Sequence, residues 1–309
     1  MPWPLCCNLG GQPNLTRPAT TVSPWRNGGR SMAETTTRNI RGVQLFERRV
    51  GAGPPVVVLH GGPGAHHDYL LPGFDSLARE RTLIYYDQRG GGRSPVKHAE
   101  PVGWREQVAD LEALRELWDL PRLTLLGYSW GGLLAMLYAT EHPARVERLG
   151  LVSPAPTWRE AREEFERRFQ ERNLDPELQA ERQALRQSGL REDDLDAYRE
   201  RVFQLSVVPY FHDPANASGL TPFRVTARTQ QEVWHSLGDY DLRPSLHTVQ
   251  CPAIVIHGND DPIPVAAARA TAEALEAPLH ILPNCGHVPH VEAPDEFTGL
   301  LTQFLHPDS

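Results

Sequence analysis

One serine stands in a sequence context that favours nucleophilic chemistry. Residues 127–131 read Gly-Tyr-Ser-Trp-Gly, which matches the pattern G-x-S-x-G, and they lie between an apolar run and a helical pattern that begins at Gly132. A nucleophile on a sharp strand-to-helix turn must adopt a strained backbone conformation, and flanking glycines leave room for it. Such a turn would project the Ser129 hydroxyl from a sheet at the amino end of a helix, where the dipole favours negative charge. We therefore predict that Ser129 is a nucleophile rather than part of a chance match in a loop.

A serine hydroxyl needs a base to activate it, and the base needs an acid to orient it. In the chain order nucleophile, acid, base, these partners should follow later strands of the same sheet. Asp260 and Asp261 end one expected strand, and His287 lies on a glycine-flanked turn after the next one. We predict His287 as the base and Asp261 as the acid. Asp260 is the alternative acid, although the spacing from Gly258 and the following Pro262 favour Asp261.

A glycine-rich loop is expected to complete the catalytic apparatus. Residues 60–64 read His-Gly-Gly-Pro-Gly and follow an apolar run, so the loop can present backbone N–H groups without interfering side chains. We predict an oxyanion hole formed by the N–H groups of Gly62 and Trp130. A phosphate-binding loop is the rival interpretation, but no G-K-[ST] follows. We expect His66 and His67 to be exposed loop residues, and we predict neither a metal site nor a cofactor.

From Val43 onward, short apolar runs alternate with helical patterns, which is typical of βαβ units on a parallel sheet. The clearest runs cover residues 55–60, 82–87, 123–127, 149–153, 253–258 and 279–283. A helical block that is roughly half charged interrupts them after the sixth expected strand. Because ligands bind at the carboxyl ends of the strands in open α/β sheets, an insertion there would cover the site. We therefore predict a core of residues 32–154 and 246–309, a helical cap of residues 155–245, and a disordered leader of residues 1–31.

Composition excludes several classes of protein. The chain has 309 residues and a formal net charge of −8, with no basic stripe, so we do not expect a nucleic-acid partner. No apolar stretch approaches the roughly 18 to 20 residues that cross a bilayer, so we expect no membrane span. Four cysteines without CxxC spacing suggest neither a disulfide scaffold nor a zinc knuckle, and we expect a cytoplasmic protein. The oligomeric state stays open.

Three motifs together carry a family resemblance. The chain resembles the α/β-hydrolase superfamily, and within it the proline iminopeptidase group, whose HGGPG, DQRGxGxS and GxSxGG motifs stand here at residues 60–64, 87–94 and 127–132. The resemblance covers about residues 40–306. It implies an α/β-hydrolase fold, a mostly parallel sheet flanked by helices and carrying a helical cap. It also implies a serine aminopeptidase that removes N-terminal residues, often proline, from short peptides.

The region of the cap departs from that family pattern. Cleavage beside a free α-amine calls for buried carboxylates that pair with the ammonium, and the family's aminopeptidases use cap glutamates for this. Glu232 is our candidate, and Asp239 and Asp241 are weaker ones. The alternative activity is hydrolysis of a carboxylic ester, a lactone or a carbon–carbon bond on the same triad, since one fold serves many substrates. A non-catalytic receptor would predict a broken triad, and this one is intact.

Overall fold

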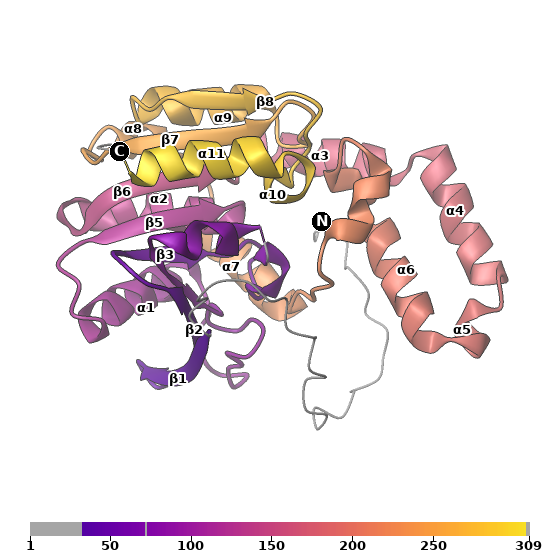
Figure 1. Cartoon of the computed structure of the whole chain (residues 1–309), viewed down its shortest axis with the longest axis horizontal. Helices are drawn as coiled ribbons and strands as arrows, with labels where there is room; N and C mark the ends of the chain where they lie inside the picture. The colour runs from indigo at the N-terminus through magenta and orange to yellow at the C-terminus, as the bar shows by residue number, and fades with distance from the viewer. Residues whose placement is uncertain (1–32, 72, 307–309) are drawn as a thin grey trace.

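An eight-stranded, mostly parallel sheet forms the centre of the protein, which we describe from a computed structural model over residues 33–71 and 73–306 (Figure 1). The predicted leader, residues 1–31, lies outside the described residues. The strand order is β1-β2-β4-β3-β5-β6-β7-β8; β2 pairs antiparallel with β1 and β4, and all later pairs are parallel. The strands are β1 (Glu34–Ile40), β2 (Val43–Gly51), β3 (Pro55–Leu59), β4 (Thr82–Tyr86), β5 (Leu123–Tyr128), β6 (Val146–Val152), β7 (Ala253–Gly258) and β8 (Leu279–Leu282). The predicted mostly parallel α/β fold is therefore confirmed.

Helices cover both faces of the sheet, which explains why the central strands are apolar on both sides. Along β3, Val57 and Leu59 join one buried cluster while Val56 and Val58 join the other, because successive side chains point to opposite faces. The first cluster includes residues of α1 (Trp104–Leu117), α2 (Trp130–Glu141) and α9 (Val265–Ala274). The second includes residues of η2 (Phe74–Arg79) and α11 (Pro294–Leu305). The short helices elsewhere in the core are η1 (Asp68–Leu70), η3 (Pro143–Arg145) and α10 (Pro289–Glu292).

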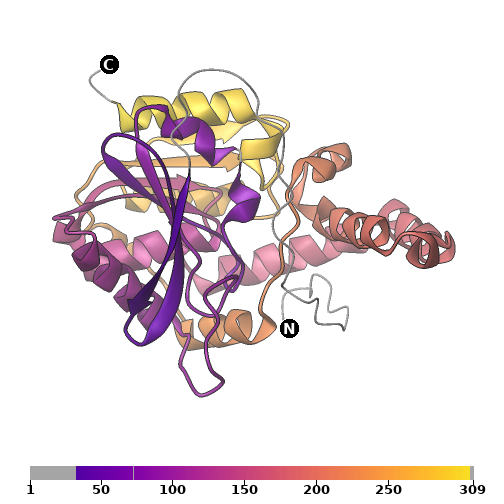
Figure 2. The ribbon, with the colours of Figure 1, turned by 60° about the horizontal axis from the view of Figure 1, so that its bottom comes forward.

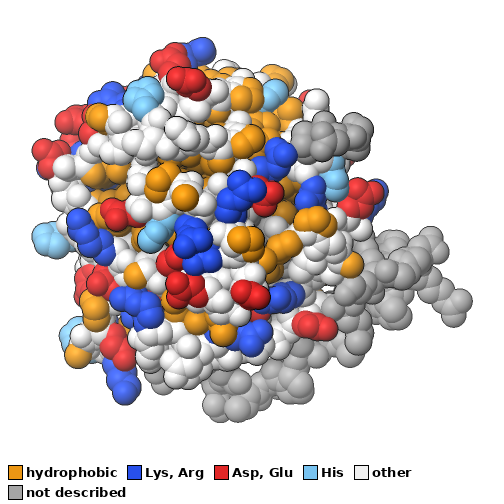
Figure 3. Space-filling model, turned by 90° about the vertical axis from the view of Figure 1, so that its left-hand side faces the viewer, with side chains coloured by type: hydrophobic (Ala, Val, Ile, Leu, Met, Phe, Trp, Pro, Cys, Tyr) orange, Lys and Arg blue, Asp and Glu red, His pale blue; other side chains and the backbone are white. Residues whose placement is uncertain are grey.

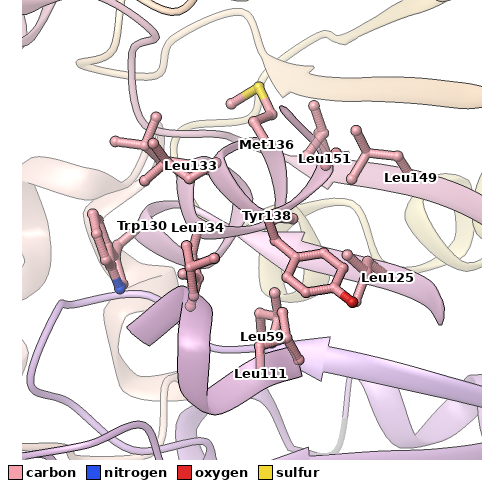
Figure 4. Packing of buried hydrophobic residues seen from close by; sticks show 14 of the residues in the cluster. Leu59, Leu111, Leu125, Trp130, Leu133, Leu134, Met136, Tyr138, Leu149 and Leu151 are labelled. Carbon is pink, nitrogen blue, oxygen red and sulfur yellow. The ribbon is translucent and has the colours of Figure 1, made fainter. Parts of the chain in front are cut away.

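Helix α2 is buried on nearly all sides, as expected of a helix whose residues are apolar all round. Figure 4 shows Leu134 and Tyr138 of α2 beside Leu59 of β3 and Leu111 of α1, with Leu125 of β5 nearby. Burying an apolar side chain of this size contributes about 1.5 to 3 kcal/mol. This packing fixes the amino end of α2, which is where the predicted nucleophile lies.

A helical segment is inserted between β6 and β7, as the charge pattern predicts. Its helices are α3 (Arg159–Asn173), α4 (Pro176–Gln187), α5 (Leu190–Asp193), α6 (Leu195–Val207), η4 (Val208–Tyr210), η5 (Pro214–Gly219), α7 (Ala227–Leu237) and α8 (Arg243–Leu246). Figures 1 and 2 show α4, α5 and α6 as an arm that extends away from the sheet. Helix α7 instead packs on the core: the hydroxyl of Thr229 donates to the carbonyl of Gly90 (2.8 Å), and Val233 is buried. The boundaries of a cap at residues 155–245 stay a prediction.

The face opposite the arm carries acidic and basic side chains interspersed with apolar ones (Figure 3). Such mixing is ordinary for a protein surface. Within the part of the chain that the structure describes, no helix has both the length and the apolar character needed to cross a membrane.

A buried ion pair joins β4 to α1. The guanidinium of Arg89, just beyond β4, donates two hydrogen bonds of 2.6 Å to the carboxylate of Asp110, which also accepts one from Arg41. Asp110 is fully buried and Arg89 is 4% exposed. The paired geometry offsets the cost of taking both charges out of water.

We expect Asp110→Ala to lower the free energy of unfolding by about 3 to 5 kcal/mol, because it leaves the Arg89 guanidinium buried without its carboxylate. Urea unfolding followed by circular dichroism measures this loss. Glu116→Ala, at an exposed position of the same helix, is the control. Equal unfolding midpoints for the two variants would show that the pair does not stabilise the fold.

Candidate active site

The predicted nucleophile lies on a tight turn between β5 and α2. Ser129 has φ = 53° and ψ = −119°, a conformation that non-glycine residues rarely adopt, and the residue is 5% exposed. A Cβ on Gly131 would lie 2.0 Å from the carbonyl oxygen of Leu59, and one on Gly127 would lie 2.4 Å from the carbonyl oxygen of Gly131. The structure thus has the expected strained backbone at Ser129, and it leaves no room for side chains at Gly127 and Gly131.

Asp261 and His287 meet at the carboxyl ends of β7 and β8. Nδ1 of His287 donates to Oδ2 of Asp261 (2.8 Å), and Oδ1 of Asp261 accepts the backbone N–H of Ile263 (2.7 Å). Burial alone would raise the pKa of Asp261, but the neighbouring His287 and His257 and the two hydrogen bonds bring it below its usual value. The carboxylate is therefore ionised at neutral pH and holds the imidazole in one orientation.

Asp260, the alternative acid, lies elsewhere. Its carboxylate pairs with Nδ1 of His212 in the inserted segment (2.8 Å). The side chains of Asp260 and His212 are 39% and 40% exposed. The geometry thus brings Asp261, and not Asp260, to His287.

A second histidine lies behind Asp261 and was missed by the sequence reasoning. Nε2 of the buried His257 donates to the carbonyl of Ile263 (3.0 Å), and its Nδ1 is 3.7 Å from Oδ2 of Asp261. Burial lowers the pKa of His257, although the Asp261 carboxylate opposes this shift. The signal for it was its position at the end of an apolar strand, four residues before Asp261.

The predicted oxyanion donors are held by a buried network. Gly62 has φ = 128°, and neither its N–H nor that of Trp130 has a hydrogen-bond partner among the described residues. Gln88 bridges the two segments: its side chain donates to the carbonyl of His60 (2.7 Å) and accepts from the indole N–H of Trp130 (2.8 Å). Nε2 of His60 accepts the backbone N–H of Gln88 (3.0 Å), and burial lowers the pKa of His60 to about 4, so this imidazole is neutral.

Asp87 holds the same glycine-rich loop from the other side. Its buried carboxylate accepts from Nδ1 of His67 (2.7 Å) and from the backbone and side chain of Arg93 (2.9 Å each). Burial would raise the pKa of Asp87, but these hydrogen bonds keep it far below its usual range. The expectation that His67 is an exposed loop residue is wrong, because its ring is buried between Phe46 and Tyr85 and bonded to Asp87.

Aromatic side chains surround the predicted base. The ring of Tyr210 stacks on His287 with centroids 5.1 Å apart, and the ring of Phe165 stacks at 6.4 Å. The hydroxyl of Tyr128, the residue before the nucleophile, donates to the carbonyl of His287 (3.0 Å). Phe165 lies on the buried face of α3 together with Phe169, whereas nothing in the sequence pointed to Tyr210.

Glu232, the predicted ammonium ligand, lies on α7 in an ion pair with Arg228 (2.7 Å), and its side chain is 43% exposed. Arg228 also donates to two backbone carbonyls of the 97–100 loop. Of the weaker candidates, Asp241 pairs with Arg243 (2.7 Å) and Asp239 is exposed. The structure therefore brings Ser129, Asp261 and His287 to one edge of the sheet but shows no contact between Glu232 and that group.

The strained turn of Ser129 and the Asp261–His287 pair lie at the carboxyl edge of a sheet with helices on both faces, an arrangement typical of serine hydrolases. The chain matches the α/β-hydrolase fold over residues 54–294 and belongs to that family. A proline iminopeptidase of Lactobacillus helveticus (strain DPC 4571) is 30% identical over 282 residues, which are 85% of this chain and 95% of the relative. The prediction of a hydrolase from the proline iminopeptidase-like branch is confirmed.

Solved structures share the fold. A proline iminopeptidase-related protein of Thermus thermophilus has a TM-score of 0.69 at 24% identity, covering 89% of this chain and 98% of that one. A meta-cleavage product hydrolase of Pseudomonas fluorescens has a TM-score of 0.64 at 22% identity, covering 89% and 98%. Enzymes with different names thus share this architecture, so the substrate must be argued from the site itself.

We expect Asp261→Asn to lower kcat by roughly 10⁴-fold, because an amide no longer stabilises the protonated imidazole or selects its tautomer. Asp260→Asn should stay within about threefold of the parent, because its exposed ion pair contributes little. Steady-state kinetics on a chromogenic ester measures both effects. The reverse ranking would make Asp260 the acid.

Proposed function

We propose that this chain is a serine aminopeptidase that removes N-terminal residues from short peptides, with proline preferred. The observation that carries the proposal is the 2.8 Å contact between Asp261 and Nδ1 of His287 beside the strained turn of Ser129. The similarity to proline iminopeptidases over nearly their whole length supports the choice of substrate.

The proposed reaction proceeds in two steps through an acyl-enzyme. Oγ of Ser129 attacks the scissile carbonyl while His287 takes its proton, and the N–H groups of Gly62 and Trp130 bind the oxyanion. Collapse of the tetrahedral intermediate breaks the C–N bond, and His287 returns the proton to the leaving amine. Water then attacks the Ser129 ester by the same route, releasing the N-terminal residue as a free acid. Asp261 orients the imidazole in both steps.

Recognition of the substrate's α-ammonium requires a carboxylate near the triad. Glu232 remains one candidate; its carboxylate pairs with Arg228 on a partly exposed helix face. A second candidate is Glu166, which follows Phe165 on α3 and forms an ion pair with Arg162. The side chain of Glu166 is 25% exposed, against 43% for Glu232.

Arg162 connects this second candidate to the nucleophile turn. Its guanidinium lies over the ring of Trp234 (5.1 Å to the centroid), and Trp234 packs edge-on against Trp130, the residue after Ser129. Phe165 of α3 also stacks on His287. The Arg162–Glu166 pair therefore lies on a helix that contacts the His287 loop directly and reaches the Ser129 turn through Trp234. Its position and burial favour Glu166 over Glu232.

We expect the enzyme to hydrolyse prolyl-nitroanilide with a free amine and to lose activity by about two orders of magnitude on the N-acetylated substrate. The reason is that acetylation removes the charge that the site's carboxylate is proposed to bind, and losing one partner of a hydrogen-bonded charge pair costs roughly 2 to 5 kcal/mol. Ser129→Ala, the control, should abolish turnover of both. Equal rates on the free and acetylated substrates, or turnover of a nitrophenyl ester alone, would contradict the aminopeptidase proposal. The enzyme would then be a hydrolase of esters, lactones or carbon–carbon bonds.

We expect Glu166→Gln to raise KM for the free prolyl substrate by about 10- to 100-fold while leaving turnover of a neutral ester within about threefold, because only the ammonium substrate needs the charge. Glu232→Gln is the matched comparison. A selective loss in Glu232→Gln instead would assign the ammonium to Glu232.

A further inference from the structure

The carboxylate of Glu292 joins the loop of the predicted base to the inserted segment. Glu292 is the last residue of α10, five positions after His287. Its Oε2 accepts the backbone N–H of Gly286 (2.7 Å), and its Oε1 accepts the backbone N–H groups of His212 (2.9 Å) and Asp213 (3.1 Å). One side chain thus receives three hydrogen bonds from two segments that are far apart in the sequence.

Two further hydrogen bonds hold the backbone of His287 itself. Its N–H donates to the carbonyl of Tyr210 (2.6 Å), and its carbonyl accepts the hydroxyl of Tyr128 (3.0 Å). The approach of the two segments is close enough to require glycine, because a Cβ on Gly286 would lie 2.2 Å from the carbonyl oxygen of Tyr210. The backbone polar groups on both sides of His287 are therefore satisfied by distant parts of the chain.

We propose that Glu292 is a positioning residue for His287, acting by locking Gly286 to residues 212 and 213 of the inserted segment. The proposal rests on the triad of the proposed function. Asp261 fixes only the ring of His287 through Nδ1, so the distance from the ring to Ser129 depends on where the loop backbone lies. A displacement of about 1 Å at a reacting group costs on the order of 10²-fold in rate. A carboxylate that accepts several N–H groups is a strong anchor, because hydrogen bonds to an ionised acceptor are roughly twice as strong as neutral ones.

Replacement of Glu292 by Gln tests the role with little change of shape. A glutamine amide can accept through one oxygen only, so its NH₂ group must face either Gly286 or residues 212 and 213, donor against donor. Glu296→Gln, an exposed position on α11, is the matched control. Both variants and the parent are compared by kcat and KM on a nitrophenyl ester, by the rate at which a fluorophosphonate labels Ser129, and by Tm.

We expect Glu292→Gln to lower kcat and the labelling rate by about 10- to 100-fold with KM within about twofold, because the base acts in both reactions while the pocket is unchanged. Glu296→Gln should match the parent. The outcome that overturns the positioning role is labelling of folded Glu292→Gln at the control's rate, whatever its Tm. If the parent enzyme is labelled at Ser129 but hydrolyses free and N-acetylated substrates equally, only the proposed aminopeptidase substrate is refuted. If the parent is not labelled, both proposals are refuted.

Discussion

The close contact between the start of α2 and the end of β3 constrains the whole site. Gly131 lies against the carbonyl of Leu59 with no room for a Cβ, so the helix amino end and the strand's carboxyl end are in van der Waals contact. The chain that leaves β3 must then pass beside Ser129 as the glycine-rich loop. This one backbone contact consequently holds the turn of Ser129 and Trp130 beside the loop of Gly62.

Three consecutive polar residues after β4 stabilise the contact between α2 and β3. Asp87 binds His67 and Arg93, Gln88 binds His60 and Trp130, and Arg89 binds Asp110 of α1. Each is buried and each reaches a different segment, so together these residues join the glycine-rich loop, α2 and α1. The low pKa of His60, about 4, means that this junction keeps its hydrogen-bond pattern across the neutral pH range.

Features set by neighbouring residues are visible in this sequence, whereas features set by contacts between distant segments are not. Ser129 and the apolar strands are marked by local patterns, since strand burial and the turn's glycines are properties of neighbouring residues. The expectation for His67 is wrong because the burial of its ring depends on Asp87, which lies 20 residues away in the sequence. Glu292 gave no signal, because its partners at residues 212 and 213 lie in the inserted segment. β1 is similarly unmarked, because it is a mostly exposed edge strand of polar residues.

The inserted segment has two parts with different relations to the chemistry. Residues 210–213 and the inner face of α3 contact the loop of His287 directly, through backbone hydrogen bonds and stacked rings. The arm of α4, α5 and α6 extends away from the sheet (Figure 2). The carboxyl-terminal part of α6 packs into the core through Phe203 and Val207. Changes in α4 and α5 can therefore alter access or recognition without displacing the His287 loop, whereas a change at residues 210–213 alters both together. A fold divided in this way can acquire new substrates through the arm while the anchored part keeps the position of the His287 loop.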